Sequence, residues 1–302
     1  MVNIRELPNK KYLLPGETAC LGCPEALGLR ALGMALGDKA VIVVPAGCST
    51  IIQGIYPRNS INLPVVNIVF AAAGATAAGL SAAYEMLGKD AVVVVWAGDG
   101  ATADIGFATL SGAAERNDNI IYICVDNEAY MNTGIQRSSL TPRGAWTTTT
   151  WVGKKEHKKD LPLIMVSHRV PYVATASVGY IMDFIEKVRK ASKIKGFKYI
   201  HLHAPCPVGW RFDASKTIQI AKLAIETGMW ILFEYHNGVF RISPPSRPYA
   251  DKSKRKPIIE YLKVQGRFKG ISEEDIKEIE KWIDETWEWY LLLEKHTSSM
   301  LN

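Results

Sequence analysis

The chain has 302 residues, of which 48% are hydrophobic and 22% charged, and its formal net charge is +6. The apolar fraction is too high for a disordered protein. No apolar run approaches the roughly 18–20 residues that a membrane-spanning helix needs, so we expect no membrane segment. The N-terminal residues contain Pro8 and Pro15 but no apolar core, which predicts no signal peptide. The length allows one large domain or two small ones.

Short β-branched runs alternate with longer Ala-rich or amphipathic stretches along most of the chain. Strands are predicted at residues 40–44, 91–96, 120–125, 172–176 and 199–203. Helices are predicted at residues 24–36, 71–87, 104–116, 181–192 and 214–227. Continuous apolar strands between helices favour a mostly parallel sheet that is covered on both faces. The predicted fold class is therefore α/β, doubly wound.

The pattern changes after Gly228. Residues 231–235 and 239–242 flank a good hairpin turn signal, and residues 244–256 predict a linker. Ser272 followed by Asp275 resembles a capping box that opens a helix to about Lys295. The apolar face of this helix is marked by Trp282, Trp287, Trp289 and Tyr290. We predict an α/β domain at 1–243 and, at 244–302, a linker and helix that pack on this domain or on a partner subunit.

Basic residues gather in two short runs, at residues 154–159 and 252–256. Neither run is interleaved with aromatic residues as a nucleic-acid surface would be, so we expect solvated loops and no nucleic-acid partner.

The sharpest local signal is Gly98-Asp99-Gly100 after one predicted strand, with Asn127 after the next. The two lie about 30 residues apart, the length of a strand–helix–strand unit, which places both at one edge of the sheet. Carboxylate and amide oxygens suit Mg²⁺, which favours phosphate oxygens in its shell. Glycines beside Asp99 let the backbone approach phosphates closely. The segment therefore predicts a metal–diphosphate site, and the alternative is an ordinary turn plus an Asn loop.

The five cysteines are an odd number in a long chain without an export signal, which favours free thiols in the cytoplasm. Cys48 and Cys206 each follow a predicted strand, at the same edge as Asp99 and Asn127. Cys20 and Cys23 precede a helix, and Cys23 stands at its N-terminus, where a thiolate is stabilised. Four thiolates can hold zinc or an iron–sulfur cluster, and spacing alone does not choose between them. The remaining cysteine, Cys124, lies in an apolar strand and is expected in the core.

The string GDGATADIGFATLSGAAERNDNIIYICVDNEAYMNTGIQ, at residues 98–136, resembles the β subunit of 2-oxoacid:ferredoxin oxidoreductases, the pyruvate:ferredoxin oxidoreductase family. The resemblance extends over about residues 12–240. It implies that Asp99, Asn127 and the backbone carbonyl of Ala129 bind Mg²⁺ beside thiamine diphosphate, with Asn132 against the cofactor. The loop at residues 136–150 would form part of the active-site wall.

The resemblance also implies that Cys20, Cys23, Cys48 and Cys206 hold one [4Fe–4S] cluster close to the thiamine. Pro24 departs from the glycine that many relatives carry after the second cysteine. No activating glutamate is evident in the sequence, and the resemblance implies that the partner chain supplies it, so Glu128 is not expected to be the base. His201 and His203 are expected to be hydrogen-bonded core residues.

The implied protein is one subunit of a cytoplasmic hetero-oligomer. It would decarboxylate a pyruvate-like 2-oxo acid oxidatively with CoA, and electrons would pass through the cluster to ferredoxin. Two other functions stay open at this point. One is a non-oxidative decarboxylase or transketolase-type subunit with a structural metal, and the other is a non-catalytic cluster-bearing assembly subunit.

Overall fold

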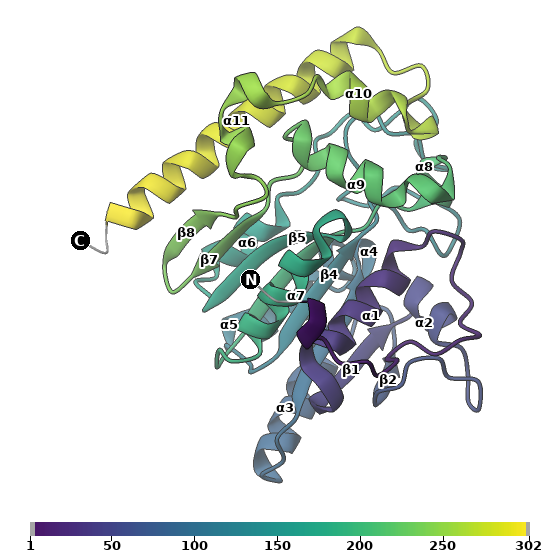
Figure 1. Cartoon of the computed structure of the whole chain (residues 1–302), viewed down its shortest axis with the longest axis vertical. Helices are drawn as coiled ribbons and strands as arrows, with labels where there is room; N and C mark the ends of the chain where they lie inside the picture. The colour runs from purple at the N-terminus through teal and green to yellow at the C-terminus, as the bar shows by residue number, and fades with distance from the viewer. Residues whose placement is uncertain (1–3, 300–302) are drawn as a thin grey trace.

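The β-branched runs form one sheet, and the computed structural model describes residues 4–299 of the chain (Figure 1). Residues 1–3 and 300–302, at the outer ends of the two predicted domains, lie outside the described residues. The strands are β1 Ala40–Pro45, β2 Val65–Ile68, β3 Val92–Gly98, β4 Ile121–Asp126, β5 Tyr172–Ser177, β6 Lys198–His203, β7 Phe233–His236 and β8 Val239–Ile242. All predicted strands are present with small shifts of their ends. The unpredicted β2 is a short, half-buried edge strand without a clear apolar pattern.

The strand order is β2-β1-β3-β4-β6-β5-β7-β8. Pairing is parallel from β2 through to β5, and the pairings of β5 with β7 and of β7 with β8 are antiparallel. The parallel register aligns the carboxyl ends: Gly98 pairs with Val125, and Asp126 pairs with His203. The predicted doubly wound α/β class is confirmed, and the segments that follow β3, β4 and β6 leave the sheet side by side.

Helices cover both faces of the sheet (Figure 1). Successive side chains of a strand point to opposite faces, so Val43 joins one buried cluster while Ile42 and Val44 join the other. Helices α1 and α7 pack together over one face, and α3 and α5 over the other. The helix bounds are α1 Pro24–Leu36, α2 Cys48–Gln53, α3 Ala73–Met86, α4 Asp99–Ala103, α5 Phe107–Glu115, α6 Leu161–Ser167, α7 Ile181–Ala191, α8 Pro207–Trp210, α9 Thr217–Glu226, α10 Ile258–Lys263 and α11 Glu273–Ser299. No helix among residues 4–299 has the length and apolar content to cross a membrane.

The segment after β3 differs from the prediction of a turn and one helix. Helix α4 begins at Asp99 itself, and the chain bends at Asp104 before α5 begins at Phe107. The Asp104 carboxyl holds the chain at this bend, because it accepts hydrogen bonds from the Tyr130 hydroxyl (2.8 Å) and the Ser139 amide (3.2 Å). Asp99 therefore stands on a short helix that is anchored at both ends.

The first basic run is only partly solvated, which corrects the expectation for residues 154–159: Lys155 and Glu156 are exposed, but Lys154, Lys158 and Lys159 are held by other segments. The Lys154 ammonium is buried and donates to the carbonyls of Ser139 (3.1 Å) and Thr141 (2.7 Å). Lys158 is buried between two carboxylates, and Lys159 donates to the carbonyl of Ala103. Buried backbone oxygens and carboxylates draw these side chains inward, since an unpaired buried acceptor is costly.

The C-terminal helix α11 packs against its own chain. Ile279, Ile283, Trp287 and Tyr290 join the main buried cluster, and α11 lies along β8. Trp289 is 53% exposed, so the expectation of one apolar face containing all four aromatic residues is wrong. Residues 287 and 289 lie about 200° apart around a helix of 3.6 residues per turn, so they cannot share a face.

The predicted linker at residues 244–256 also packs tightly. The Arg255 guanidinium stacks 4.7 Å from the Trp287 ring centroid and pairs with Asp284 at 3.0 Å. The Lys256 amide donates to the carbonyl of Glu226 (2.9 Å). The division of the chain at residue 243 stays a prediction.

We predict that Trp287→Ala lowers the free energy of unfolding by about 3–5 kcal/mol, because it empties a buried site and removes the hydrogen bond to the Gly228 carbonyl. Urea unfolding of the purified subunit measures this change. The control is Trp289→Ala on the same helix, which is exposed and should change stability by less than about 0.5 kcal/mol. Equal losses in both variants would contradict the packing described here.

Candidate functional site

A pocket opens at the carboxyl edge of the sheet, beside the ends of β1, β3 and β4. Residues from the β3–α4 junction and from the segment after β4 line it together. The lining includes all six residues with a predicted cofactor-binding role: Gly98, Asp99, Gly100, Asn127, Ala129 and Asn132. Strand pairing, rather than closeness in the sequence, brings the two groups to one cavity.

Asp99 is 1% exposed at the start of α4, and the Ser138 hydroxyl donates a hydrogen bond to its carboxyl. Burial and the nearby Asp126 carboxylate raise the pKa of Asp99 well above its usual range. A buried carboxyl with one donor and a like charge beside it is a favourable cation ligand, because a cation removes the cost of ionising it.

The two glycines beside Asp99 have different surroundings. A Cβ atom at Gly98 would meet no atom within 4 Å, so the backbone here borders open space. A Cβ atom at Gly100 would lie 2.4 Å from the Tyr130 ring. Gly98 therefore fits the expected close approach of phosphates, whereas the absence of a side chain at Gly100 is required by Tyr130.

Asn127 is 5% exposed, and its two amide atoms are in different situations. Its Nδ2 atom donates to the Glu25 carboxyl at 3.1 Å, while its Oδ1 atom is buried and has no hydrogen-bond partner. A buried amide oxygen left without a donor at this pocket suits a hard cation such as Mg²⁺.

Glu25 is a site residue that the sequence analysis missed. It is 4% exposed and accepts hydrogen bonds from the Ser49 hydroxyl and from Asn127. Burial raises the pKa of its carboxyl. Its position in the first turn of a helix gave no signal, since acidic residues there are common and usually solvated.

The four predicted cysteine ligands, Cys20, Cys23, Cys48 and Cys206, line one neighbouring cavity. They reach it from three places. Cys20 and Cys23 precede α1, Cys48 begins α2 directly after β1, and Cys206 caps α8 after β6. The structure thus brings together residues that span most of the chain, while Cys124 is buried in β4 within the core, as predicted.

Three of the thiols, Cys23, Cys48 and Cys206, lie in surroundings that favour their neutral forms. Burial, reinforced by the Glu25 carboxylate, raises the pKa of Cys23 to about 12 and also raises that of Cys48. Burial likewise raises the pKa of Cys206 to about 11. Backbone hydrogen bonds at the N-terminus of α1 lower the Cys23 pKa, as expected, but burial raises it by more.

The two cavities share a wall. Glu25, Cys48, Asn127 and Asn132 line both of them. Met131 lines the first cavity, and a Cβ atom at Gly209 would lie 2.1 Å from its sulfur. Groups bound in the two cavities would therefore be neighbours.

The residues on either side of Asn127 belong to a buried ionic network and do not line the pocket. Lys158 lies 3.0 Å from Asp126 and 2.9 Å from Glu128, and His201 lies 2.9 Å from Asp126. Burial alone would raise the pKa of Asp126, but Lys158 and His201 hold it well below its usual range. The Glu128 carboxylate is paired and does not face the cofactor pocket, which agrees with its exclusion as a base.

His201 and His203 are core residues, as expected. His201 is hydrogen-bonded to Tyr199 at 2.9 Å and to Asp126. His203 stacks on Trp230 with ring centroids 4.5 Å apart, and burial lowers its pKa to about 3, so its ring is neutral.

The loop at residues 136–150 does not line the pocket, because Thr133 is the last residue in the chain that does so. The loop supports residues that line it. Ser138 donates to Asp99, and the Thr141 hydroxyl donates to the Glu128 carbonyl at 2.6 Å. The expectation that this loop forms part of the wall is thus corrected to a supporting position.

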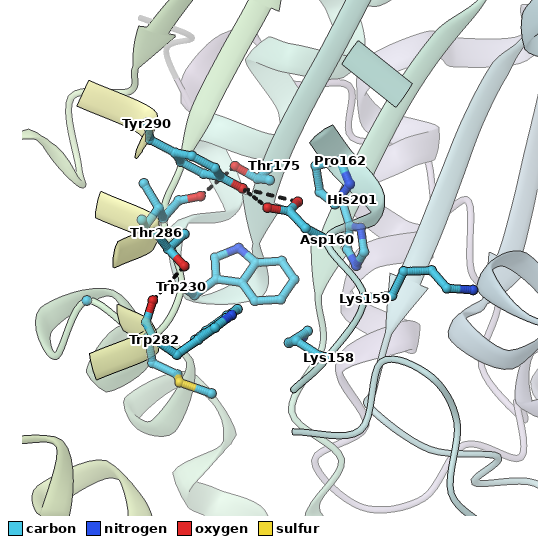
Figure 2. Close-up of a pocket in the computed structure, with 13 residues that line it drawn as sticks. Lys158, Lys159, Asp160, Pro162, Thr175, His201, Trp230, Trp282, Thr286 and Tyr290 are labelled. Atoms are coloured by element: carbon cyan, nitrogen blue, oxygen red, sulfur yellow. Dashed lines mark hydrogen bonds between the residues drawn. The ribbon is translucent and has the colours of Figure 1, made fainter. Parts of the chain in front are cut away.

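Figure 2 shows a separate cavity between α11 and the sheet. Trp230, Trp282 and Tyr290 form its aromatic side, and the Tyr290 hydroxyl donates to Asp160 at 3.0 Å. It contains neither Asp99 nor any of the cysteines. We therefore take the pocket at Asp99 and the cysteine cavity as the candidate site.

Comparison with known proteins agrees with this geometry. Residues 45–202 match the family described as thiamine pyrophosphate enzyme, C-terminal TPP binding domain. The chain is 50% identical over 293 residues to ketoisovalerate oxidoreductase subunit VorB of Pyrococcus abyssi, with 93% of each chain covered. It is 49% identical over 285 residues to pyruvate synthase subunit PorB of Methanothermobacter marburgensis, covering 92% of this chain and 97% of the relative.

Among solved structures, the chain is similar to 2-oxoglutarate:ferredoxin oxidoreductase from Magnetococcus marinus. The TM-score is 0.59 and the identity 25%, over 72% of this chain and 82% of that chain. The chain therefore belongs to the thiamine pyrophosphate enzymes, and within them to the family of 2-oxoacid:ferredoxin oxidoreductase β subunits. It is a subunit of an enzyme and works together with other chains.

We predict that alkylation of Cys23 and Cys206 by iodoacetamide in the metal-free protein is slow at about pH 8 and still rises about tenfold per pH unit at about pH 10. Only the thiolate reacts, and below a raised pKa its fraction climbs with pH. A cysteine peptide with a pKa of about 8.5 levels off earlier and serves as the control. Mass spectrometry of the two peptides gives the rates, and a plateau near the control's pH would contradict the dominance of burial.

Proposed function

We propose that this chain binds thiamine diphosphate and Mg²⁺ in the pocket at Asp99, and a [4Fe–4S] cluster in the cysteine cavity. The assembled cytoplasmic complex would convert a 2-oxo acid and CoA to acyl-CoA, CO₂ and a proton, with two one-electron reductions of ferredoxin. The observation that carries this proposal is the wall that the two cavities share. A redox cluster beside the cofactor is what separates oxidative from simple decarboxylation.

The donors around the pocket fit a magnesium–diphosphate group. Asp99 offers a buried carboxylate, and Asn127 offers an unpartnered amide oxygen. Ala129 lines the same pocket, and its carbonyl is the third ligand that the resemblance implies. All three are hard oxygen donors, which Mg²⁺ prefers, and the diphosphate would complete the shell.

Thiamine diphosphate, when bound, supplies a nucleophilic carbon for attack on the 2-oxo group and an electron sink. This chain would anchor the diphosphate through the metal ligands and hold Asn132 against the cofactor. The pocket wall includes the apolar side chains of Phe70, Trp96 and Met131, which would exclude water from the reacting end.

The cysteine cavity suits a cluster better than a zinc ion. A tetrahedral zinc ion with Zn–S bonds of about 2.3 Å draws its four sulfurs to within about 3.8 Å of one another. Among residues 4–299, no group of three or more His, Cys, Asp or Glu side chains is arranged to hold a single metal ion. The four cysteines do line one cavity, which favours a larger group such as a cluster. All four are free thiols, which a reducing cytoplasm would preserve.

The activating carboxyl group would come from a partner subunit. Asp99 and Glu25 are the two acids that line the pocket. Asp99 is assigned to the metal, and both oxygens of Glu25 accept hydrogen bonds from this chain, so Glu25 orients Asn127. The exposed Trp151 and Val152, on the loop after β4, give a second subunit apolar surface to cover.

We expect Asp99→Ala to abolish binding of thiamine diphosphate and substrate-dependent ferredoxin reduction by the assembled complex, because a metal ligand is lost. Asp90→Ala, at an exposed carboxylate, is the control and should leave both unchanged. Calorimetric titration with thiamine diphosphate and Mg²⁺ measures binding, and anaerobic ferredoxin reduction measures turnover. Intact binding and turnover in Asp99→Ala would refute the site.

A second variant pair tests the cluster. We expect Cys206→Ser to lose iron, acid-labile sulfide and visible absorbance, whereas Cys124→Ser should keep them and lose only packing, since Cys124 is buried in β4. Zinc in the purified protein, or equal cluster loss in both variants, would contradict the ligand assignment.

The family indicates the substrate class, a 2-oxo acid. Assays with a panel of 2-oxo acids would identify the individual substrate. The relatives are named for ketoisovalerate, pyruvate and 2-oxoglutarate. Anaerobic reduction of ferredoxin by the complex with each of these acids, with and without CoA, would assign the substrate. Activity that does not require CoA or ferredoxin would favour the non-oxidative alternative.

A further inference from the structure

The turn after β4 carries two carboxylates that face away from the cofactor pocket. Asp126 pairs with Lys158 and His201, and Glu128 pairs with Lys158. Asn127, between them, is the residue of the three that lines the pocket. Lys158 and His201 line the separate cavity near α11, in which Figure 2 labels both of them. The network thus determines which residue of the turn is presented to a metal ion.

The backbone of this turn is strained and needs support. Glu128 has φ of 65°, in the left-handed region that costs a residue with a side chain about 1 kcal/mol or more. Its amide donates to the Asp126 carboxylate at 3.0 Å, and its carbonyl accepts from the Thr141 hydroxyl. Contacts from other segments therefore hold the conformation that aims Asn127.

One of these contacts comes from the C-terminal segment, beyond the matched residues 45–202. Arg267, between α10 and α11, is 3% exposed, and its Nη2 atom lies 2.6 Å from the Glu128 carboxylate. Its guanidinium also lies 3.6 Å from the ring centroid of Trp210. The Trp210 indole in turn donates to the Asn127 carbonyl at 2.8 Å. A single side chain thus supports the turn through two neighbouring residues.

Arg267 is itself held in place. Its Nε atom donates to the Gln265 side chain at 2.9 Å, and its carbonyl accepts from the Trp146 amide at 2.8 Å. A planar guanidinium can pair with a carboxylate in its plane and stack on an aromatic ring with its face, which an ammonium group cannot do. The contacts of Arg267 with Glu128 and Trp210 therefore depend on the planar guanidinium group of arginine.

We propose that Arg267 is a positioning residue for the metal–diphosphate site, which keeps Glu128 turned away and Trp210 against the Asn127 carbonyl so that Asn127 Oδ1 faces the pocket. The inference rests on the proposed function, since it assumes that Asn127 is a ligand of Mg²⁺. It makes the C-terminal segment a component of the cofactor site in addition to its role in packing.

The test compares Arg267→Met and Arg267→Lys in the assembled complex. We expect Arg267→Met to raise the dissociation constants of Mg²⁺ and thiamine diphosphate about tenfold or more, as loss of a residue that orients a metal ligand does. Arg267→Lys keeps the charge and should restore part of the affinity. Iron and sulfide content should stay at the wild-type level, because Arg267 does not line the cysteine cavity.

The matched control is Arg255→Met. Arg255 also stacks on a tryptophan and pairs with a carboxylate in the same segment, but its partners are Trp287 and Asp284. It should lower the melting temperature without changing cofactor affinity. Cofactor affinity unchanged in Arg267→Met, or weakened equally in Arg255→Met, would overturn the proposal.

In Arg267→Met, Glu128 would lose one of its cationic partners while buried, which could prevent folding. The second variant therefore combines Arg267→Met with Glu128→Gln. Removing both charges should restore folding, yet leave cofactor affinity weakened about tenfold. Wild-type affinity in this pair would overturn the proposal. Asp99→Ala distinguishes failure of the proposed function from failure of this inference. If Asp99→Ala binds thiamine diphosphate normally, the proposed function is wrong. If Asp99→Ala loses binding while the Arg267 variants keep wild-type affinity, only the role of Arg267 is wrong.

Discussion

Parallel pairing of β1, β3, β4 and β6 is the constraint on which both cavities depend. Each of these strands delivers one functional residue at its carboxyl end: Cys48 after β1, Asp99 after β3, Asn127 after β4 and Cys206 after β6. In a parallel sheet these ends lie at one edge, so residues far apart in the sequence meet without any direct interaction between their segments. The site is therefore a consequence of the register of the sheet, and the helices on both faces keep that register rigid.

The carboxyl edge of the sheet contains two layers with different electrostatics. In the inner layer, buried cations compensate the carboxylates of Asp126 and Glu128. In the outer layer, burial raises the pKa of Asp99, Cys23 and Cys206. A metal bound there would allow these groups to ionise at low cost, so under the proposed function its binding would be coupled to proton release. The acids of the inner layer are already paired with cations of this chain.

The C-terminal segment extends this inner layer. Residues from α10 and α11 share one buried cluster with the sheet, and Arg267 reaches from them to the turn after β4. A boundary at residue 243 separates two patterns in the sequence, but side-chain packing is continuous across it. Residues 244–299, which the sequence pattern sets apart from the α/β domain, thus contribute to the stability of that domain. Through Arg267 they also support the turn beside the candidate cofactor pocket.

The alternation of strands and helices could be predicted from the sequence alone, as could the Gly98-Asp99-Gly100 segment with Asn127. The sequence also separated Cys124, in an apolar strand, from the other four cysteines. These features are local: each depends on periodicity, on a short motif or on what directly follows a strand. Other features became evident only in the folded chain. Trp287 is buried, whereas Trp289 is exposed. Glu25 is buried beside both cavities, and Lys154 and Lys158 point inward. Their burial depends on partners from distant segments, such as Asn127 for Glu25 and Asp126 for Lys158, and no pattern within a short stretch of sequence encodes the identity of such partners.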